Sequence, residues 1–228
     1  MHELDILYED NHLIAVNKPA TILVQGDITG DVHLVDLVKE YLRVKYDKKG
    51  NVFCGLIHRL DRPTSGVVVL AKTSKALQRM NNLFKERMVR KTYWAVVKGI
   101  PEEQEMTITN YLKKDQKANK SKAFNKEMPF TKQASLSYRV LGMIDNYSLL
   151  EIEPKTGRHH QIRVQLSSIG KPIKGDLKYG FSRSNADGSI HLHARKLSFT
   201  HPVSNLEIEI KADPPSKDKV WQELIKVI

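Results

Sequence analysis

The chain has 228 residues, with 37 Lys and Arg against 26 Asp and Glu and a formal net charge of +11 at pH 7. This length fits one large domain or two small ones, and the charge suggests a polyanionic partner, either nucleic acid or an anionic membrane surface. Cys54 is the only cysteine, which excludes a disulfide framework and a cysteine-based zinc site. Residues 1–10 show no apolar signal region and no segment reaches membrane-spanning length, so we expect a cytoplasmic protein.

The first part of the chain predicts a hairpin followed by a helix. Apolar residues alternate from Leu4 and become continuous at residues 13–16, which is typical of two short strands joined by a turn. Lys18 and Pro19 end this pattern. We therefore expect, in order, a hairpin over 4–17, a loop over 21–31, a helix over 32–46 and a turn over 47–51.

A basic loop with one carboxylate precedes the next apolar segment. In HRLDRPTSGVVVLAK, residues 67–71 predict a buried strand, and Gly66 lets the backbone turn into it. Asp61 lies on this loop between Arg59 and Arg62, whose guanidinium groups favour the ionised carboxylate. Such a carboxylate is a candidate nucleophile or base, although an Asp before Arg-Pro is also an ordinary turn former.

Strands and helices alternate through the rest of the chain. Thr73 and Ser74 are suited to begin a helix with an apolar stripe from 77 to 88. We expect next a strand over 89–99, strands over 134–141 and 147–153, a helix over about 158–169, a late strand within 191–202, a strand over 206–211 and a closing helix over 216–228.

Residues 113–132 differ in composition from the rest, since they hold seven lysines, two acids and little periodic apolar character. We interpret them as a basic loop within the domain. The loop is either a solvated charge run or an arm that closes on phosphates.

The segment HRLDRPTSGVVVLAK resembles the active-site motif of the RluA-type pseudouridine synthases, which isomerise uridine to pseudouridine in structured RNA. Four other segments match that family in the expected order: LYEDNHLIAVNKPA, the K-x-Y-x-A-x-V-x-G pattern at residues 91–99, GRHHQIRVQLSSIGKPIKGD and HLHARKLSFTHP. Two departures occur, because His159 replaces a usual Thr or Ser and Gln165 replaces a usual His.

The resemblance implies roles for individual residues. Asp61 takes the place of the catalytic aspartate, and Arg163 that of the arginine which pairs with it. Tyr93 takes the place of the tyrosine that stacks on the flipped base and removes the C5 proton. Arg59 matches the arginine that displaces the target base from its stack. We also expect RNA contacts at six further positions of the motifs: His58, Arg62, Lys18, Arg158, His160 and Gln161.

The resemblance also implies the fold and the reaction. The fold would be the α+β pseudouridine synthase fold, a bent mixed or antiparallel sheet flanked by helices, with a central basic cleft. The reaction is an isomerisation, so no cofactor is needed, and the substrate would be a stem-loop of ribosomal or transfer RNA. We expect one catalytic domain over residues 1–228, with no N-terminal S4-type domain, no membrane association, no obligate protein partner and a monomeric state.

Three other interpretations are weaker. The histidines at 159–160 and 191–193 supply too few ligands for a metal site, and no acidic cluster joins them. A hydrolytic glycosidase or metal nuclease would need paired carboxylates or a ligand cluster, whereas Asp61 is a lone acid. A catalytically silent RNA-binding or ribosome-assembly factor would be expected to lack one of the three matched catalytic residues.

Overall fold

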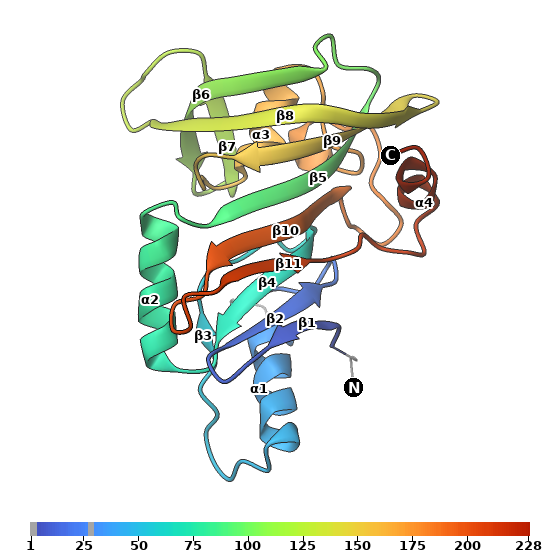
Figure 1. Cartoon of the computed structure of the whole chain (residues 1–228). Helices are drawn as coiled ribbons and strands as arrows, with labels where there is room; N and C mark the ends of the chain where they lie inside the picture. The colour runs from blue at the N-terminus through green and yellow to red at the C-terminus, as the bar shows by residue number, and fades with distance from the viewer. Residues whose placement is uncertain (1–3, 27–29) are drawn as a thin grey trace. The chain divides into compact units, whose positions relative to one another are not determined.

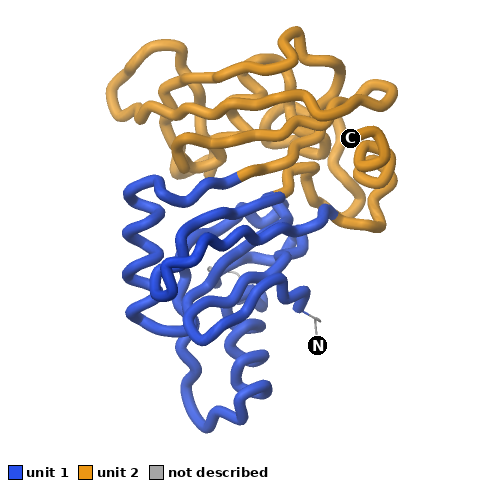
Figure 2. Tube along the Cα trace, viewed as in Figure 1, with its two compact units in different colours: residues 1–91, 194–214 blue, residues 92–193, 215–228 orange. Residues whose placement is uncertain are grey.

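The computed structural model describes residues 4–26 and 30–228, which form two compact units (Figure 2). Unit 1 contains the chain up to Lys91 and Ala194–Pro214, and unit 2 contains Thr92–His193 and Pro215–Ile228. The described residues form eleven strands and four α-helices, which confirms the α+β class (Figure 1). Residues 27–29 of the expected loop lie outside the described residues. The single domain and the central cleft stay predictions.

Unit 1 is built on antiparallel strand pairs. β2 (Leu13–Lys18) pairs with β1 (Ile6–Glu9) and with β4 (Ser65–Ala71), which also pairs with β3 (Gly55–Leu56). β10 (Leu192–Thr200) lies next to β4 and pairs with β11 (Glu207–Lys211). The expected hairpin, late strand and helices α1 (Leu34–Lys45) and α2 (Ser74–Lys85) are confirmed.

The strand that follows the Asp61 loop is buried over its whole length. All seven residues of β4 are buried, and Val67 and Val69 pack with Leu13 and with Met80 of α2. Thr73 caps α2, because its hydroxyl accepts from the Ala76 N–H at 3.2 Å. β4 therefore provides a rigid base for the loop before it.

Unit 2 is an antiparallel sheet in the order β5 (Arg90–Lys98), β9 (Tyr147–Pro154), β8 (Lys132–Ile144), β6 (Glu105–Asp115), β7 (Lys120–Phe124). Helix α3 (Gln161–Ser168) covers one face, where Ile162 and Leu166 pack on the apolar strand residues (Figure 1). Trp221 of α4 (Lys219–Ile225) packs against Trp94 of β5 in a separate cluster. The sheet thus holds α3 at a fixed place in this unit.

The interpretation of residues 113–132 as a loop is wrong, because β6 and β7 form a hairpin across Lys113–Lys122 and its neighbouring pairs. The pattern was hidden because the inward positions of β7 are the small residues Ser121 and Ala123, which carry little apolar signal. The short elements β3 and η1 (Leu177–Tyr179) were also not expected.

Two helices begin three residues later than expected. His160 has a left-handed backbone (φ 53°), so α3 begins at Gln161 instead of residue 158. The closing helix begins at Lys219, since Asp218 accepts from the N–H groups of Val220 and Trp221. Neither start is visible as a change in hydrophobic period.

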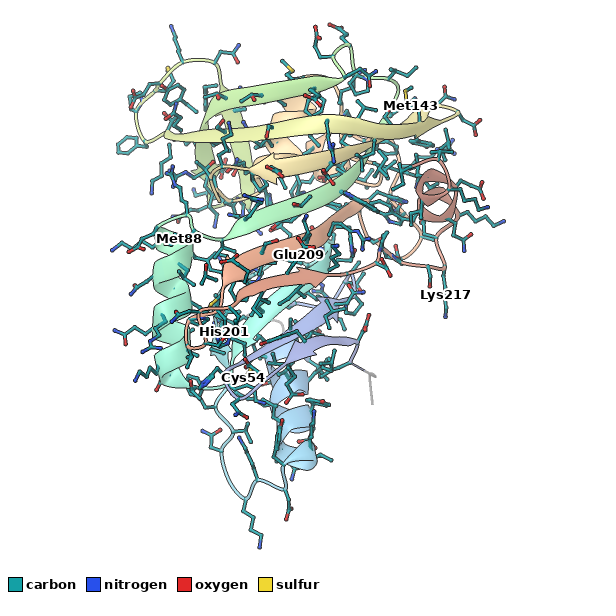
Figure 3. All side chains as sticks on the ribbon, viewed as in Figure 1. Cys54, Met88, Met143, His201, Glu209 and Lys217 are labelled. Atoms are coloured by element: carbon teal, nitrogen blue, oxygen red, sulfur yellow. The ribbon has the colours of Figure 1, made fainter. Side chains whose placement is uncertain are left out.

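Two further features of the described residues concern membrane spans and Cys54. No helix among the described residues is long and apolar enough to cross a membrane. Cys54, labelled in Figure 3, lies in unit 1 between α1 and β3 and is partly buried. Burial raises the pKa of its thiol to about 11, so the thiol is protonated at neutral pH.

Candidate active site

The Asp61 loop is fixed by backbone hydrogen bonds in unit 1. The Thr64 N–H donates to the Asp61 carbonyl at 3.0 Å, which closes a turn, and the Thr21 N–H donates to the Arg62 carbonyl at 2.8 Å. Asp61 itself is partly exposed, whereas Thr64 is buried. The loop therefore presents its carboxylate from a rigid backbone, as expected for a reactive group.

Lys18 is a buried side chain that holds the backbone of this loop. Its ammonium donates to the carbonyls of Pro19 and Ile22, both at 2.8 Å, and to that of Arg62 at 3.3 Å. Burial lowers its pKa to about 7, against an opposing effect of the Asp61 carboxylate. Since its side chain is fully buried, this placement argues against a direct contact of Lys18 with RNA.

The two arginines that flank Asp61 differ in their surroundings. The Arg62 guanidinium forms an ion pair with Asp31 at 2.9 Å and donates to the Thr21 carbonyl at 3.0 Å. Arg59 is exposed. The guanidinium of Arg62 therefore has partners in Asp31 and Thr21, and the expected flanking of Asp61 by two guanidinium groups stays a prediction.

His58 supports the loop from the other end. Its Nε2 accepts from the Val69 N–H of β4 at 3.0 Å, and its ring stacks on Phe84 with 5.0 Å between ring centroids. Burial lowers its pKa to about 4, and the charge of Lys91 contributes in the same direction. His58 is thus a neutral ring that ties the loop to the strand.

Tyr93 lies in unit 2 near the beginning of β5, opposite Ile152 of β9. It is partly exposed and packs against the apolar cluster on the face of the sheet that α3 covers. The strand itself follows from its alternating β-branched and aromatic residues. Tyr93 therefore combines an ordered ring with access to solvent, which a base-stacking role requires.

Arg163 lies on α3 in a buried ion pair. Its Nε and Nη2 donate to the two carboxylate oxygens of Asp176 at 2.7 and 2.8 Å, and the exposed fractions of the two side chains are 6% and 1%. The Tyr179 ring lies against the guanidinium, with 5.1 Å from the ring centroid to Cζ. The expected pairing of Arg163 with Asp61 stays a prediction.

Sequence reasoning missed Asp176 and Tyr179. Asp176 is the last residue of the segment GRHHQIRVQLSSIGKPIKGD, but a lone acid after Gly carries no signal of its own. The 3₁₀ turn that brings both side chains to Arg163 has no hydrophobic period. Only the fold shows their relation to α3.

The residues before Arg163 mostly hold the backbone. Gln161 is buried, accepts from the Thr156 hydroxyl and the Arg158 N–H, and donates to the Ser135 carbonyl, which argues against an RNA contact for its side chain. Arg158 is exposed and donates to a β8 carbonyl. His160 hydrogen-bonds through Nδ1 with the Tyr179 hydroxyl at 2.8 Å.

His159, which departs from the usual motif, connects this segment to the β6–β7 hairpin. Its Nδ1 lies 3.0 Å from the Ser121 hydroxyl, and its Nε2 lies 3.1 Å from Oδ1 of Asn119. The rings of His159 and His160 stack at 3.7 Å. Within the described part of the chain, no group of three or more His, Cys, Asp or Glu side chains is placed to hold a metal ion.

Known proteins resemble this chain over nearly all of its length. tRNA pseudouridine synthase C of Vibrio parahaemolyticus is 35% identical over 241 residues, covering 97% of this chain and 94% of that protein. The protein of the same name from Haemophilus influenzae is 35% identical over 240 residues, covering 97% and 96%. The solved structure of human RNA Pseudouridylate Synthase Domain Containing 4 superposes with a TM-score of 0.80 at 25% identity, covering 97% of this chain and 93% of that chain.

The family model described as RNA pseudouridylate synthase matches residues 12–168, which include Asp61, Tyr93 and Arg163. The fold of the human structure is the pseudouridine synthase fold, as expected. The match covers well over half of the chain, so the chain belongs to the RNA pseudouridylate synthase family and is an isomerase of the RluA type.

Proposed function

We propose that this enzyme converts a uridine of transfer RNA to pseudouridine and that Asp61 is its catalytic residue. The observation that carries the proposal is the 35% identity, over 97% of the chain, to proteins named tRNA pseudouridine synthase C. The hydrogen bonds made by Lys18 and Thr64 hold the backbone of the Asp61 loop in place, which supports Asp61 as the catalytic residue. Ribosomal RNA is the alternative substrate of the same chemistry.

The reaction breaks the N1–C1′ bond of uridine, turns the uracil and forms a C5–C1′ bond. The C5 proton then leaves and N1 gains a proton, so the product is an isomer and no electron acceptor is needed. In a stem the target base is stacked, and the enzyme must first flip it out. We assign base displacement to Arg59 and bond cleavage to Asp61.

The other two roles fall to residues of unit 2. Tyr93 stacks on the uracil and takes the C5 proton, which its ordered and partly exposed ring supports. To Arg163 we assign the role of the family's arginine that pairs with the catalytic aspartate, a role suited to a planar guanidinium. Exposed Arg59 and Arg158 contribute to RNA binding, together with the net charge of +11.

The proposal is tested with purified protein and transcribed tRNA and ribosomal RNA fragments, with pseudouridine located by a carbodiimide-stop sequencing readout. We expect the wild-type chain to modify a single site in a tRNA. Asp61→Asn is expected to bind the same RNA and to yield no product. The matched control is Asp47→Asn, the same change at an exposed left-handed position of unit 1, where Asn is tolerated and wild-type activity is expected.

Each outcome has a separate meaning. Product with the Asp61→Asn chain would refute the catalytic role of Asp61. Product in ribosomal RNA fragments alone would refute the tRNA assignment and keep the reaction. Binding of RNA should also weaken steeply with salt, because lysines and arginines neutralise phosphates, and salt-independent binding would contradict this account. The cytoplasmic location stays a prediction of the sequence.

A further inference from the structure

The surroundings of Arg163 fix the plane of its guanidinium. Asp176 receives Nε–H and Nη2–H with its two oxygens, at 2.7 and 2.8 Å, so the two planar groups are locked together. Tyr179 lies against the guanidinium as well. A long arginine side chain otherwise has several rotatable bonds, and this double contact removes most of that freedom.

Backbone hydrogen bonds hold Asp176 in place. Its N–H donates to the Ile173 carbonyl at 3.0 Å, and its carbonyl accepts from the N–H groups of Tyr179 and Phe181 at 3.1 and 3.0 Å. The side chain is 1% exposed. The carboxylate is therefore a fixed reference point, and its position determines where the guanidinium lies.

Tyr179 is fixed in turn from two sides. Its hydroxyl accepts from the Ser121 N–H of β7 at 2.8 Å and hydrogen-bonds with Nδ1 of His160 at 2.8 Å. The ring that covers Arg163 thus connects the lysine-rich hairpin with the turn before α3.

We propose that Asp176 is a positioning residue for the pseudouridine synthase reaction, acting through Arg163. Through its two hydrogen bonds it holds the Arg163 guanidinium in one fixed orientation, and the Tyr179 ring packs against the same guanidinium. This inference rests on the proposed function, in which Arg163 takes part in catalysis. Asp176 would affect the rate of the chemical step and leave RNA binding almost unchanged.

The test is a double-mutant cycle under single-turnover conditions, with enzyme in excess over the RNA. For Asp176→Asn we expect the rate constant to fall about 100-fold, as for a misplacement of about 1 Å, while the Kd for RNA changes by less than about threefold. In an Arg163→Met background, the same change should alter the remaining rate by less than about twofold, because its effect passes through Arg163. Asp145→Asn, at an exposed left-handed turn of unit 2, is the matched control.

A structural role alone would lower the rate in both backgrounds, and that result would overturn the inference. Thermal unfolding of every variant is recorded beside the rates. Asp176→Glu is the second variant, since it keeps the charge but lengthens the side chain by one methylene, and we expect a folded chain with a rate constant about tenfold lower than that of the wild type. A wild-type rate for this variant would also overturn the inference.

Two further results separate the inference from the proposed function. If neither single variant folds while Arg163→Met with Asp176→Leu folds, the pair is structural and the inference is wrong. If the wild-type chain forms no pseudouridine in any RNA, the proposed function fails. An active wild-type chain and an equally active Asp176→Asn chain would refute the inference alone.

Discussion

The loop that carries Asp61 and the helix that carries Arg163 each depend on a buried basic side chain, but the two side chains act differently. In the loop, Lys18 donates to three backbone carbonyls and thereby fixes the main chain around a partly exposed carboxylate. In the helix, Arg163 is the residue for which we propose a catalytic role, and its guanidinium is fixed by the carboxylate of Asp176. A short side chain such as Asp needs a rigid backbone, whereas a long one such as Arg needs a fixed counter-ion.

The rigid backbone of the loop is tested most strongly at its junction with β4. Gly66 has φ +113°, and a Cβ there would lie within 2.5 Å of the Ala194 backbone. We expect Gly66→Ala to cost more than about 4 kcal/mol and to leave no folded protein, because neither backbone can move away within the buried pairing. Soluble yield and circular dichroism measure this.

Gly50→Ala is the matched control for this change. Gly50 also has a positive φ, +104°, but no atom lies within 4 Å of the position that a Cβ would take there. Gly50→Ala should lower the free energy of unfolding only by the cost of a positive φ for a residue with a Cβ, about 1 to 2 kcal/mol. Equal losses of stability at the two positions would show that the close approach of β4 and β10 is not what fixes the loop.

The next test concerns Lys18, the buried side chain that holds the loop. Lys18→Met keeps the length of the side chain but leaves three carbonyls without their donor, and we expect the free energy of unfolding to fall by about 3 kcal/mol. Lys75→Met, at an exposed position of α2, should change it by less than about 0.5 kcal/mol. Urea unfolding measures the free energy of unfolding of both variants. Similar losses in the two would show that Lys18 does not stabilise the loop.

The two regions also differ in how much of their structure the sequence predicts. The Asp61 loop and its strand lie in one contiguous segment, so their residues and order could be predicted, including the need for Gly66. Asp176 lies thirteen residues after Arg163, beyond the end of α3, and meets it only through an unpatterned 3₁₀ turn. The burial of Lys18 and Gln161 could not be predicted for the same reason, since burial by distant segments does not show in a motif.

The two regions should also differ in their response to pH. His58 holds the loop as a neutral ring, and burial lowers its pKa from 6.5 to about 4. Between these values the unfolded chain binds more protons than the folded one, so this contribution is complete above pH 6.5 and is lost as the pH falls toward 4. From pH 7.5 to pH 5.0 the free energy of unfolding should decrease by about 2 kcal/mol through His58.

Urea unfolding at both pH values measures this contribution. In the His58→Gln chain the ring no longer titrates, so the decrease over the same range should be smaller by that amount. Arg163 does not titrate in this range, since an arginine stays charged throughout. An equal decrease in both chains would mean that the loop is not held by a neutral His58.

The smallest expected effect concerns the second support of Arg163. Tyr179→Phe removes the hydroxyl that binds Ser121 and His160 but keeps the ring against the guanidinium. We expect a loss of about 1 to 2 kcal/mol in the free energy of unfolding, because one buried N–H loses its acceptor, and a rate of pseudouridine formation close to that of the wild type. Removing an exposed hydroxyl elsewhere in unit 2 should cost less than about 0.5 kcal/mol. If Tyr179→Phe instead slows the reaction as much as Asp176→Asn, then the guanidinium is held through the hydroxyl network and the hairpin, and the carboxylate is not its main support.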